Sequence, residues 1–243
     1  MRTKTLALFA MAALAASAAG AADLPAQAKG ASSVDTLQRA ELLAARLSWD
    51  GAIAAYREAI AASPKDAALW NRLGICYQKK GDAKAARSAY KKALDLRKDY
   101  AEAWNNLGTI DHARGKYKPA ISAYGKAIKL NPQDAVFHKN LGNAYLALGK
   151  VQEAFEAYQE AFRLDPTVLE SQGPGIPAAG IDAATQSYYL AKLLAANGQT
   201  ESAIEFLRRA KEAGFRDWAR VRSDPDFRAV VQDPRFQELA PAP

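Results

Sequence analysis

Few residues of this 243-residue chain have the chemistry of a catalytic or metal site. There is one cysteine, Cys76, and there are two histidines, His112 and His138, which lie far apart in the sequence and belong to no recognisable motif with an acidic partner. Nucleophilic catalysis needs an adjacent base, and a metal ion needs several ligands held together. No glycine-rich phosphate loop follows a predicted strand. We therefore predict that the protein is not an enzyme and that it uses no metal and no other cofactor.

Asparagine side chains are the more informative polar group. Asparagine is a poor helix former, so several asparagines on one helical face require a reason. A side-chain amide both donates and accepts hydrogen bonds, and it can pair with the backbone of an extended peptide whatever the peptide's side chains. Asn106 and Asn140 occupy the same position in successive sequence blocks, as described next.

The segments that carry these asparagines repeat with a period of 34 residues. Each block has a Trp-x-x-Leu-Gly-x-x-Tyr pattern or a close variant, then a glycine, an Ala-x-x-x-Tyr-x-x-Ala pattern and, in two blocks, a proline. The three patterns begin at Trp70, Trp104 and His138. Within each block the apolar residues follow i, i+3, i+4, i+7, which is one face of a helix. The glycine after each first helix supplies the turn.

This order of residues resembles the tetratricopeptide repeat family, in its exported bacterial form. The resemblance implies an all-α solenoid of antiparallel helix pairs, with ligands held along a concave surface lined by the first helices. We expect a degenerate block at 33–66, full blocks at 67–100, 101–134 and 135–168, a Gly/Pro-rich connector at 169–183, a divergent fifth block at 184–217 and a short helical C-terminal cap at 218–243. In the cap, two Asp-Pro pairs, Asp224-Pro225 and Asp233-Pro234, each predict the start of a short helix.

The N-terminus has the pattern of a secretory signal peptide at residues 1–22, followed by a lead-in at 23–32. Basic residues precede an apolar run from Leu6 to Ala19, and small residues follow it. The run is short for a membrane anchor, which is the alternative. We expect cleavage near Ala21 or Ala22, a periplasmic or secreted protein, and no transmembrane span in the mature chain. Cys76 cannot form an intramolecular disulfide, and its position beside the core stripe favours a buried thiol.

The resemblance also predicts which residues face the groove. They are the polar neighbours of the core stripe on the first helices: Asn71, Arg72, Asn105, Asn106, Thr109, Lys139, Asn140 and Asn143. Two interpretations stay open, because Asn106 and Asn140 resemble the asparagine ladders that hold peptides and are also common at this position in the family. Lys139 and Asn143 match the opening pair of the family's carboxylate clamp, but Tyr189 takes the next asparagine position, so the clamp is incomplete.

Two residues depart from the block pattern. Asp111 replaces the core tyrosine, and a carboxylate there must reach either solvent or a cation. His138 replaces the first tryptophan, and no second ligand is spaced to join it in a metal site, so we predict a packed residue.

Charge is concentrated in one block. Residues 67–100 carry nine basic and three acidic side chains, whereas 33–66 and 135–168 are each −1. Lys84, Arg87 and Lys91 follow i, i+3, i+7 on the outer side of a second helix, which is either a solvated face or a surface for an anionic envelope component. The predicted export disfavours nucleic acid as a partner. The sequence thus leaves two functions: a scaffold that binds a peptide or helix in its groove, or an assembly subunit of an envelope complex docked through its convex basic face.

Overall fold

A computed structural model describes residues 33–168 and 183–240, which contain helices and no strand. The predicted signal peptide, the lead-in and nearly all of the connector lie outside these ranges. The helices form five antiparallel pairs: α1 (Ser33–Ala45) with α2 (Trp49–Ala62), α3 (Ala67–Lys80) with α4 (Ala83–Leu96), α5 (Ala101–Ala113) with α6 (Tyr117–Leu130), α7 (Ala135–Ala147) with α8 (Val151–Leu164), and α9 (Ala183–Ala196) with α10 (Thr200–Glu212). The predicted all-α array of helix pairs is confirmed.

Turn chemistry explains where the helices begin and end. Gly81 ends α3 at φ 89°, a left-handed conformation that glycine adopts without a steric penalty. Asp66 and Asp82 begin α3 and α4, and the carboxylate of each accepts a hydrogen bond from a backbone N–H of the first turn. The turn glycines repeat with the 34-residue period, since Gly115 and Gly149 also have positive φ, whereas the equivalents of Asp66 and Asp82 in the next block, Tyr100 and Lys116, make no side-chain cap.

A glycine–tyrosine contact sets the distance between the two helices of a pair. A Cβ atom at Gly74 would lie 2.5 Å from Cε1 of Tyr90, whose side chain is fully buried. Gly108 faces Tyr124 and Gly142 faces Tyr158 in the same way. Only glycine lets the tyrosine ring of the second helix lie directly on the backbone of the first.

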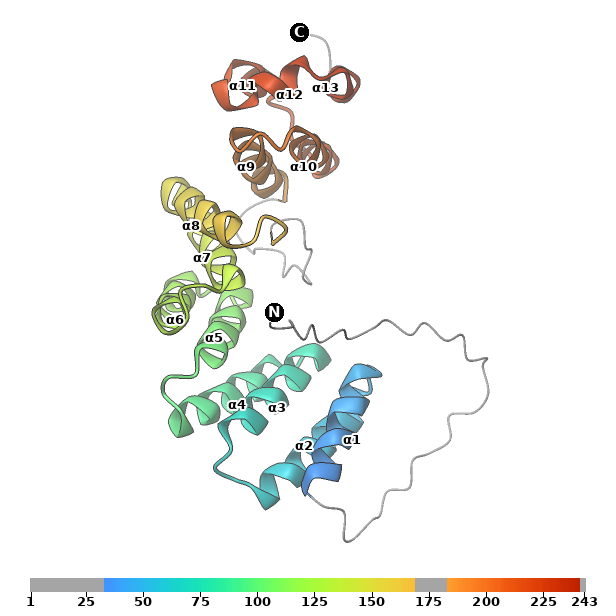
Figure 1. Ribbon diagram of the computed structural model, residues 1–243, viewed down its shortest axis with the longest axis vertical. Coiled ribbons are helices and arrows are strands. Elements are labelled where there is room, and N and C mark those ends of the chain that lie inside the picture. The colour runs from blue at the N-terminus through green and yellow to red at the C-terminus, as the bar shows by residue number, and fades with distance from the viewer. Residues whose placement is uncertain (1–32, 169–182, 241–243) are drawn as a thin grey trace, which may run out of the picture.

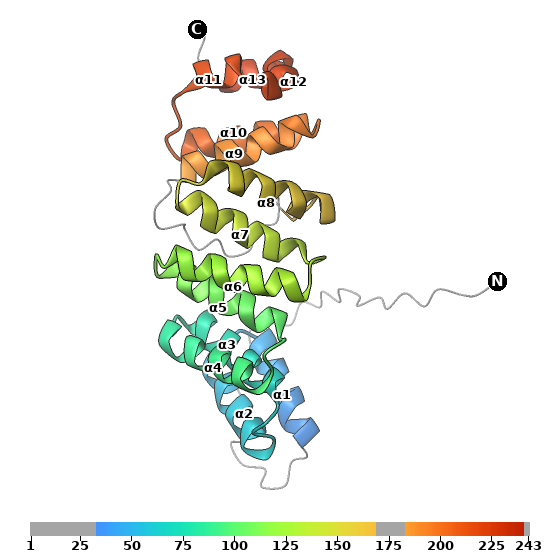
Figure 2. The ribbon, with the colours of Figure 1, turned by 90° about the vertical axis from the view of Figure 1, so that its left-hand side faces the viewer.

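The pairs stack into a curved array (Figure 1). In that view α1, α3 and α5 lie to the right of their partners, on the inner side of the curve, and Figure 2 shows α4, α6 and α8 on the opposite side. The fifth pair differs, because α9 lies to the left of α10 in Figure 1. The inner surface of first helices therefore does not continue in the same orientation into the fifth pair.

The C-terminal segment closes the array. It contains α11 (Trp218–Ser223), a 3-10 turn (Pro225–Phe227), α12 (Arg228–Gln232) and α13 (Pro234–Leu239). Asp224 and Asp233 begin the 3-10 turn and α13, and each carboxylate accepts a backbone N–H two residues further on. Phe227 and Phe236 are fully buried in a core cluster that extends from α7 to α13. These short helices cover the apolar face that the last pair would otherwise expose.

Candidate functional site

The asparagines on the first helices form hydrogen bonds between repeats. Asn106 Nδ2 donates to Asn71 Oδ1 at 3.1 Å, and Asn140 Nδ2 donates to Asn105 Oδ1 at 2.9 Å. The two bonds are equivalent, since each joins a half-buried asparagine to a buried one in the preceding repeat. The structure therefore brings these four residues together in two identical pairs.

This pairing corrects the prediction that all four asparagines project into the groove. Asn71 is only 5% exposed and Asn105 only 9% exposed. Both are covered by the following repeat, whose amide satisfies their oxygen atoms. Asn106 and Asn140 remain half-buried, and among the described residues no hydrogen bond to either Oδ1 atom is present. These two Oδ1 atoms are therefore available as hydrogen-bond acceptors for a ligand in the groove.

The buried tyrosines use two other predicted groove residues as hydrogen-bond partners. Tyr124 donates its hydroxyl to Thr109 Oγ1 at 3.3 Å, and Tyr158 donates to Asn143 Oδ1 at 2.7 Å. Burial raises the pKa of both phenols, so they stay protonated donors. Asn143 Oδ1 also accepts from Gln186 of α9 at 2.9 Å, which links the fourth pair to the fifth.

The two predicted basic groove residues are engaged at the ends of the asparagine series. Arg72 forms an ion pair with Glu41 of α1. Lys139 takes the position of Asn71 and Asn105, and its Nζ donates to the carbonyl oxygen of Val168 at 3.0 Å. Burial lowers the pKa of Lys139, and Asp165 opposes that shift. Since Lys139 and Asn143 both have intramolecular partners, the pair that resembles a carboxylate clamp instead closes the fourth repeat.

His138 makes the same hydrogen bond as the tryptophans that it replaces. Trp70 Nε1 donates to the carbonyl of Pro64 at 3.0 Å, and Trp104 Nε1 donates to that of Lys98 at 2.8 Å. His138 Nε2 lies 3.0 Å from the carbonyl of Pro132, again six residues earlier. A carbonyl oxygen can only accept, so Nε2 carries the proton. The sequence missed this role because it appears only when the three blocks are compared bond by bond.

Asp111 is buried and ion-paired. Its side chain is 5% exposed and lies 3.2 Å from Nε of Arg87, on α4 of the preceding repeat. The cation that the sequence required is therefore present. The same contact corrects the predicted basic face, because Arg87 turns toward α5, whereas Lys84 and Lys91 remain exposed on α4.

His112, next to Asp111, is 4% exposed, and its Nε2 atom is buried without a hydrogen bond. The ring contacts Tyr117 edge to face, with 5.3 Å between the ring centroids. Burial lowers the pKa of His112, and an interaction with the backbone of Asn143 opposes the shift. A neutral imidazole packed between repeats fits this environment. Cys76 is also buried, at 2% exposure, and burial raises its pKa, so the predicted buried thiol is confirmed.

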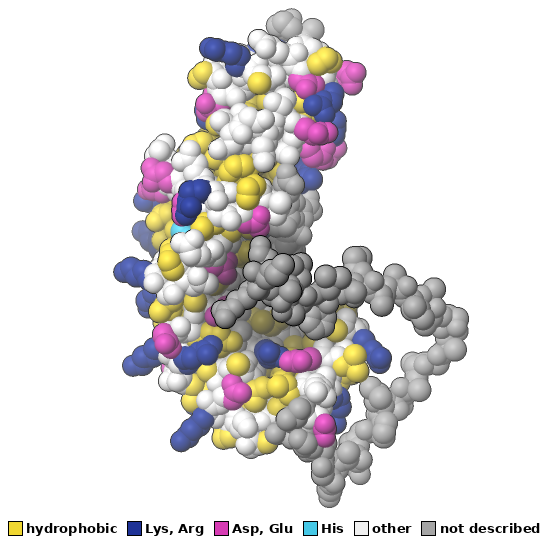
Figure 3. Space-filling model, in the orientation of Figure 1, with side chains coloured by type: hydrophobic (Ala, Val, Ile, Leu, Met, Phe, Trp, Pro, Cys, Tyr) yellow, Lys and Arg dark blue, Asp and Glu magenta, His cyan; other side chains and the backbone are white. Residues whose placement is uncertain are grey.

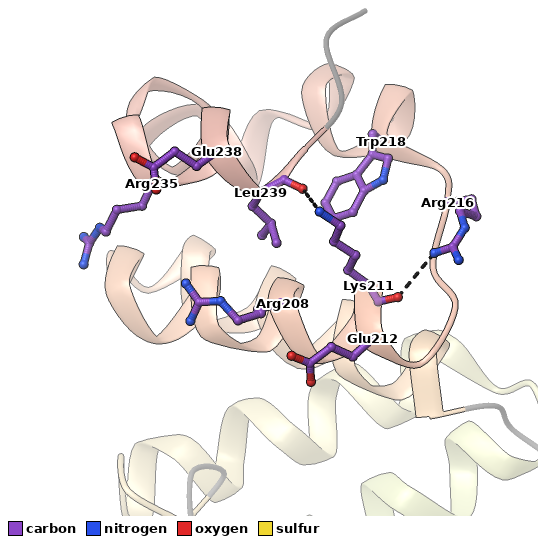
Figure 4. Close-up of a pocket in the computed structure, with 8 residues that line it drawn as sticks. All are labelled: Arg208, Lys211, Glu212, Arg216, Trp218, Arg235, Glu238 and Leu239. Atoms are coloured by element: carbon purple, nitrogen blue, oxygen red, sulfur yellow. Dashed lines mark hydrogen bonds between the residues drawn. The ribbon is translucent and has the colours of Figure 1, made fainter.

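A pocket of about 650 Å³ lies between α10 and the C-terminal helices (Figure 4). Its lining includes four basic side chains, two carboxylates, Trp218 and Leu239. Lys211 Nζ donates to the carbonyl of Leu239 at 2.6 Å, as Figure 4 shows. Arg235 is held by Asp233 and Glu201. The Lys211–Leu239 and Arg235–Glu201 contacts therefore join α10 to the C-terminal helices on either side of the pocket.

Within residues 33–168 and 183–240, no group of three or more potential ligands is arranged to hold a metal ion. In the same ranges, no helix has both the length and the apolar character needed to cross a bilayer. Among the buried side-chain nitrogen and oxygen atoms of these ranges, only Nε2 of His112 and Oε1 of Gln199 lack a hydrogen-bond partner.

Comparisons with known proteins agree with this geometry. Residues 43–81 match the family described as TPR repeat, and residues 65–133 and 135–168 match tetratricopeptide repeat families. Together the matches cover just over half of the chain. No curated protein matches it.

Several solved structures share the fold. A crystal structure of MamA is 24% identical, with a TM-score of 0.53 over 72% of this chain and 93% of that one. YrrB, described as a TPR protein with an unusual peptide-binding site, is 21% identical, with a TM-score of 0.51 over 75% of this chain and 87% of that one. Identities this low concern the fold alone. Proteins built from this repeat are non-enzymatic binding scaffolds, which agrees with the prediction that the chain is not an enzyme. The matched segments, the repeated glycine–tyrosine contacts and the five helix pairs show that the chain belongs to the tetratricopeptide repeat family.

Proposed function

We propose that this protein is an exported scaffold that holds an extended peptide or a helix of a partner protein against its first helices. The observation that supports this most directly is the repeated amide pair. Asn106 and Asn140 each use Nδ2 to bind the preceding repeat, and each keeps Oδ1 available at an equivalent position one repeat apart. Acceptors that recur in this way suit the N–H groups of a peptide backbone.

The test must separate ligand binding from the bond between repeats. The double variant Asn106→Ala/Asn140→Ala removes the groove amides and the inter-repeat hydrogen bonds. The double variant Asn71→Ala/Asn105→Ala removes the same inter-repeat bonds and keeps the groove amides. We expect the first variant to lose capture of a partner from periplasmic extract and the second to retain it, with thermal unfolding recorded for both. Equal capture by the two variants would remove the asparagines from the binding surface.

The leader sequence supports the exported location. Its basic head, apolar run and small residues predict cleavage near Ala21 or Ala22. The mass of the protein isolated from a periplasmic fraction checks this directly. A chain that retains Met1 and stays in the cytoplasm would contradict export.

A second candidate is an assembly subunit of a cell-envelope complex that docks through the convex basic face. Thirteen basic and five acidic residues lie between positions 79 and 130, which gives +8 in this segment against +7 for the whole chain. Figure 3 shows dark-blue side chains along the left-hand edge, where α4 and α6 lie. Lys84→Glu/Lys91→Glu should abolish association with the complex. Arg87 is left unchanged, since removing it would leave the buried Asp111 carboxylate without its ion-pair partner.

A further inference from the structure

We infer that the outer faces of α4 and α6 bind the surface of an anionic lipid bilayer. This inference rests on the second candidate function and names the anionic component. It concerns six lysines, called here the lysine face: Lys84, Lys91, Lys92, Lys118, Lys126 and Lys129.

The lysine face repeats with the helices. Counting each 34-residue block from its first residue, position 18 is Lys84 in the second block and Lys118 in the third. Position 26 is Lys92 and Lys126 in the same two blocks. The first and fourth blocks hold other residues at these positions: Asp50, Glu58, Gln152 and Glu160. The fold therefore accepts acidic or neutral residues at these positions. Lys126 also has a packing role, because its Nζ lies 4.0 Å from the centroid of the Trp104 ring. No such contact is seen for Lys84, Lys92 or Lys118 among the described residues, so packing does not explain these three lysines.

The charge of this face is not neutralised within the chain. All six lysines are exposed, and none pairs with a carboxylate among the described residues. The only acidic residue of α4 and α6 is Asp95. Along the convex side, α8 has the opposite character, with three glutamates and one arginine. The excess of positive charge is thus confined to two adjacent repeats.

The residue types favour a bilayer over a single acidic ligand. Lysine is a compact, strongly hydrated point charge on a flexible stem, whereas arginine suits bidentate recognition of a defined carboxylate. Positions 18 and 26 lie about 12 Å apart along each helix, from a rise of about 1.5 Å per residue. Lysines spread over this distance can interact with many negative charges of an extended surface at once. Leu130, which directly follows Lys129, is 42% exposed, so an apolar side chain also adjoins the face.

Vesicle sedimentation tests the inference with the chain from residue 23 onward. The probes are phosphatidylcholine vesicles with and without phosphatidylglycerol. The test variant is Lys84→Gln/Lys92→Gln/Lys118→Gln/Lys126→Gln. A control with the same net charge is Arg46→Gln/Lys65→Gln/Arg216→Gln/Arg228→Gln, which changes exposed residues elsewhere. We expect the affinity of the test variant for anionic vesicles to fall by at least about tenfold, and the control to bind like wild type.

Binding should also weaken as salt rises from about 0.1 M to about 0.5 M, because screening shortens the range of the attraction. Equal weakening in both variants would mean that net charge alone acts, and equal binding to neutral vesicles would mean that charge is irrelevant. Either result overturns the inference. So does capture of soluble poly-glutamate without vesicle binding, which would indicate an acidic protein partner. Unchanged vesicle binding by Asn106→Ala/Asn140→Ala keeps this test separate from that of the groove.

Discussion

At the scale of residues, the departures from the repeat pattern are compensated by specific contacts. His138 keeps the N–H that tryptophan donates to the preceding turn. Asp111 replaces a tyrosine and is balanced by Arg87 from the neighbouring repeat. Each replacing side chain thus has a hydrogen-bond or ion-pair partner, which avoids the cost of a buried polar group left without one.

Removing Arg87 should therefore destabilise the protein through Asp111. We expect Arg87→Met to lower the free energy of unfolding by about 2–3 kcal/mol, below the usual range for a fully buried pair because Arg87 is partly exposed. Urea unfolding measures the change. Arg87→Met/Asp111→Tyr, which restores the tyrosine of the other full blocks, should recover most of it. A single variant as stable as wild type would show that Asp111 does not need the cation.

His112 should make stability depend on pH. Its pKa is lowered by burial, so below the unfolded value of 6.5 the unfolded chain binds a proton that the folded chain resists. Stability present above pH 6.5 is then lost as pH falls toward the lower, folded pKa. Urea unfolding between pH 7.5 and pH 5 should show a smaller loss for His112→Gln than for wild type. Identical pH profiles would contradict this assignment.

At the scale of elements, the helix pair is held by one close contact. Tyr90, Tyr124 and Tyr158 each lie on a glycine of the first helix. The hydroxyl of each donates to a polar residue of that same helix, and Tyr90 uses Gln78 at 2.7 Å. Each pair thus combines an apolar contact with a satisfied buried hydroxyl.

Two glycine substitutions test that contact. Gly108→Ala places a Cβ about 2.7 Å from the buried ring of Tyr124, and should lower the free energy of unfolding by about 1–3 kcal/mol. Gly125→Ala, on the second helix of the same pair, meets no atom within 4 Å, and should raise it by up to about 1 kcal/mol. Urea midpoints that move in the same direction for both variants would refute the argument.

At the scale of the whole molecule, packing is divided along the array. One core cluster joins residues of α1 to α4, and another extends from α7 to α13. In repeat proteins each unit contacts its neighbours only, so stability need not be uniform. The asparagine pairs and the Arg87–Asp111 contact connect the central repeats across these boundaries.

A substitution in the cap should therefore act locally. Phe236→Ala removes a fully buried ring and should cost about 3–5 kcal/mol. Amide hydrogen exchange should rise in α9 to α13 and stay unchanged in α1 to α4. Val136→Ala, at an exposed position, is the control and should leave exchange unaltered. A uniform rise along the chain would mean that the array unfolds as one unit.

The sequence by itself determined the all-α fold, the helix pairs and their core residues. Local chemistry explains this success, since the caps, turn glycines and apolar spacing all lie within one 34-residue block. The same reasoning predicted that the Asp111 carboxylate must reach either solvent or a cation, but it did not identify Arg87 as that cation.

Only the tertiary structure decided which polar groups are free and which are used. Asn71 and Asn105 appeared to face the groove, yet they are covered by amides of the next repeat. Arg87 seemed to belong to the convex basic face, yet it turns toward Asp111. These partners lie 24 to 35 residues apart in sequence, and they meet only because of the angle at which one pair stacks on the next. The period fixes what lies inside a repeat, whereas the contacts between repeats depend on that stacking angle.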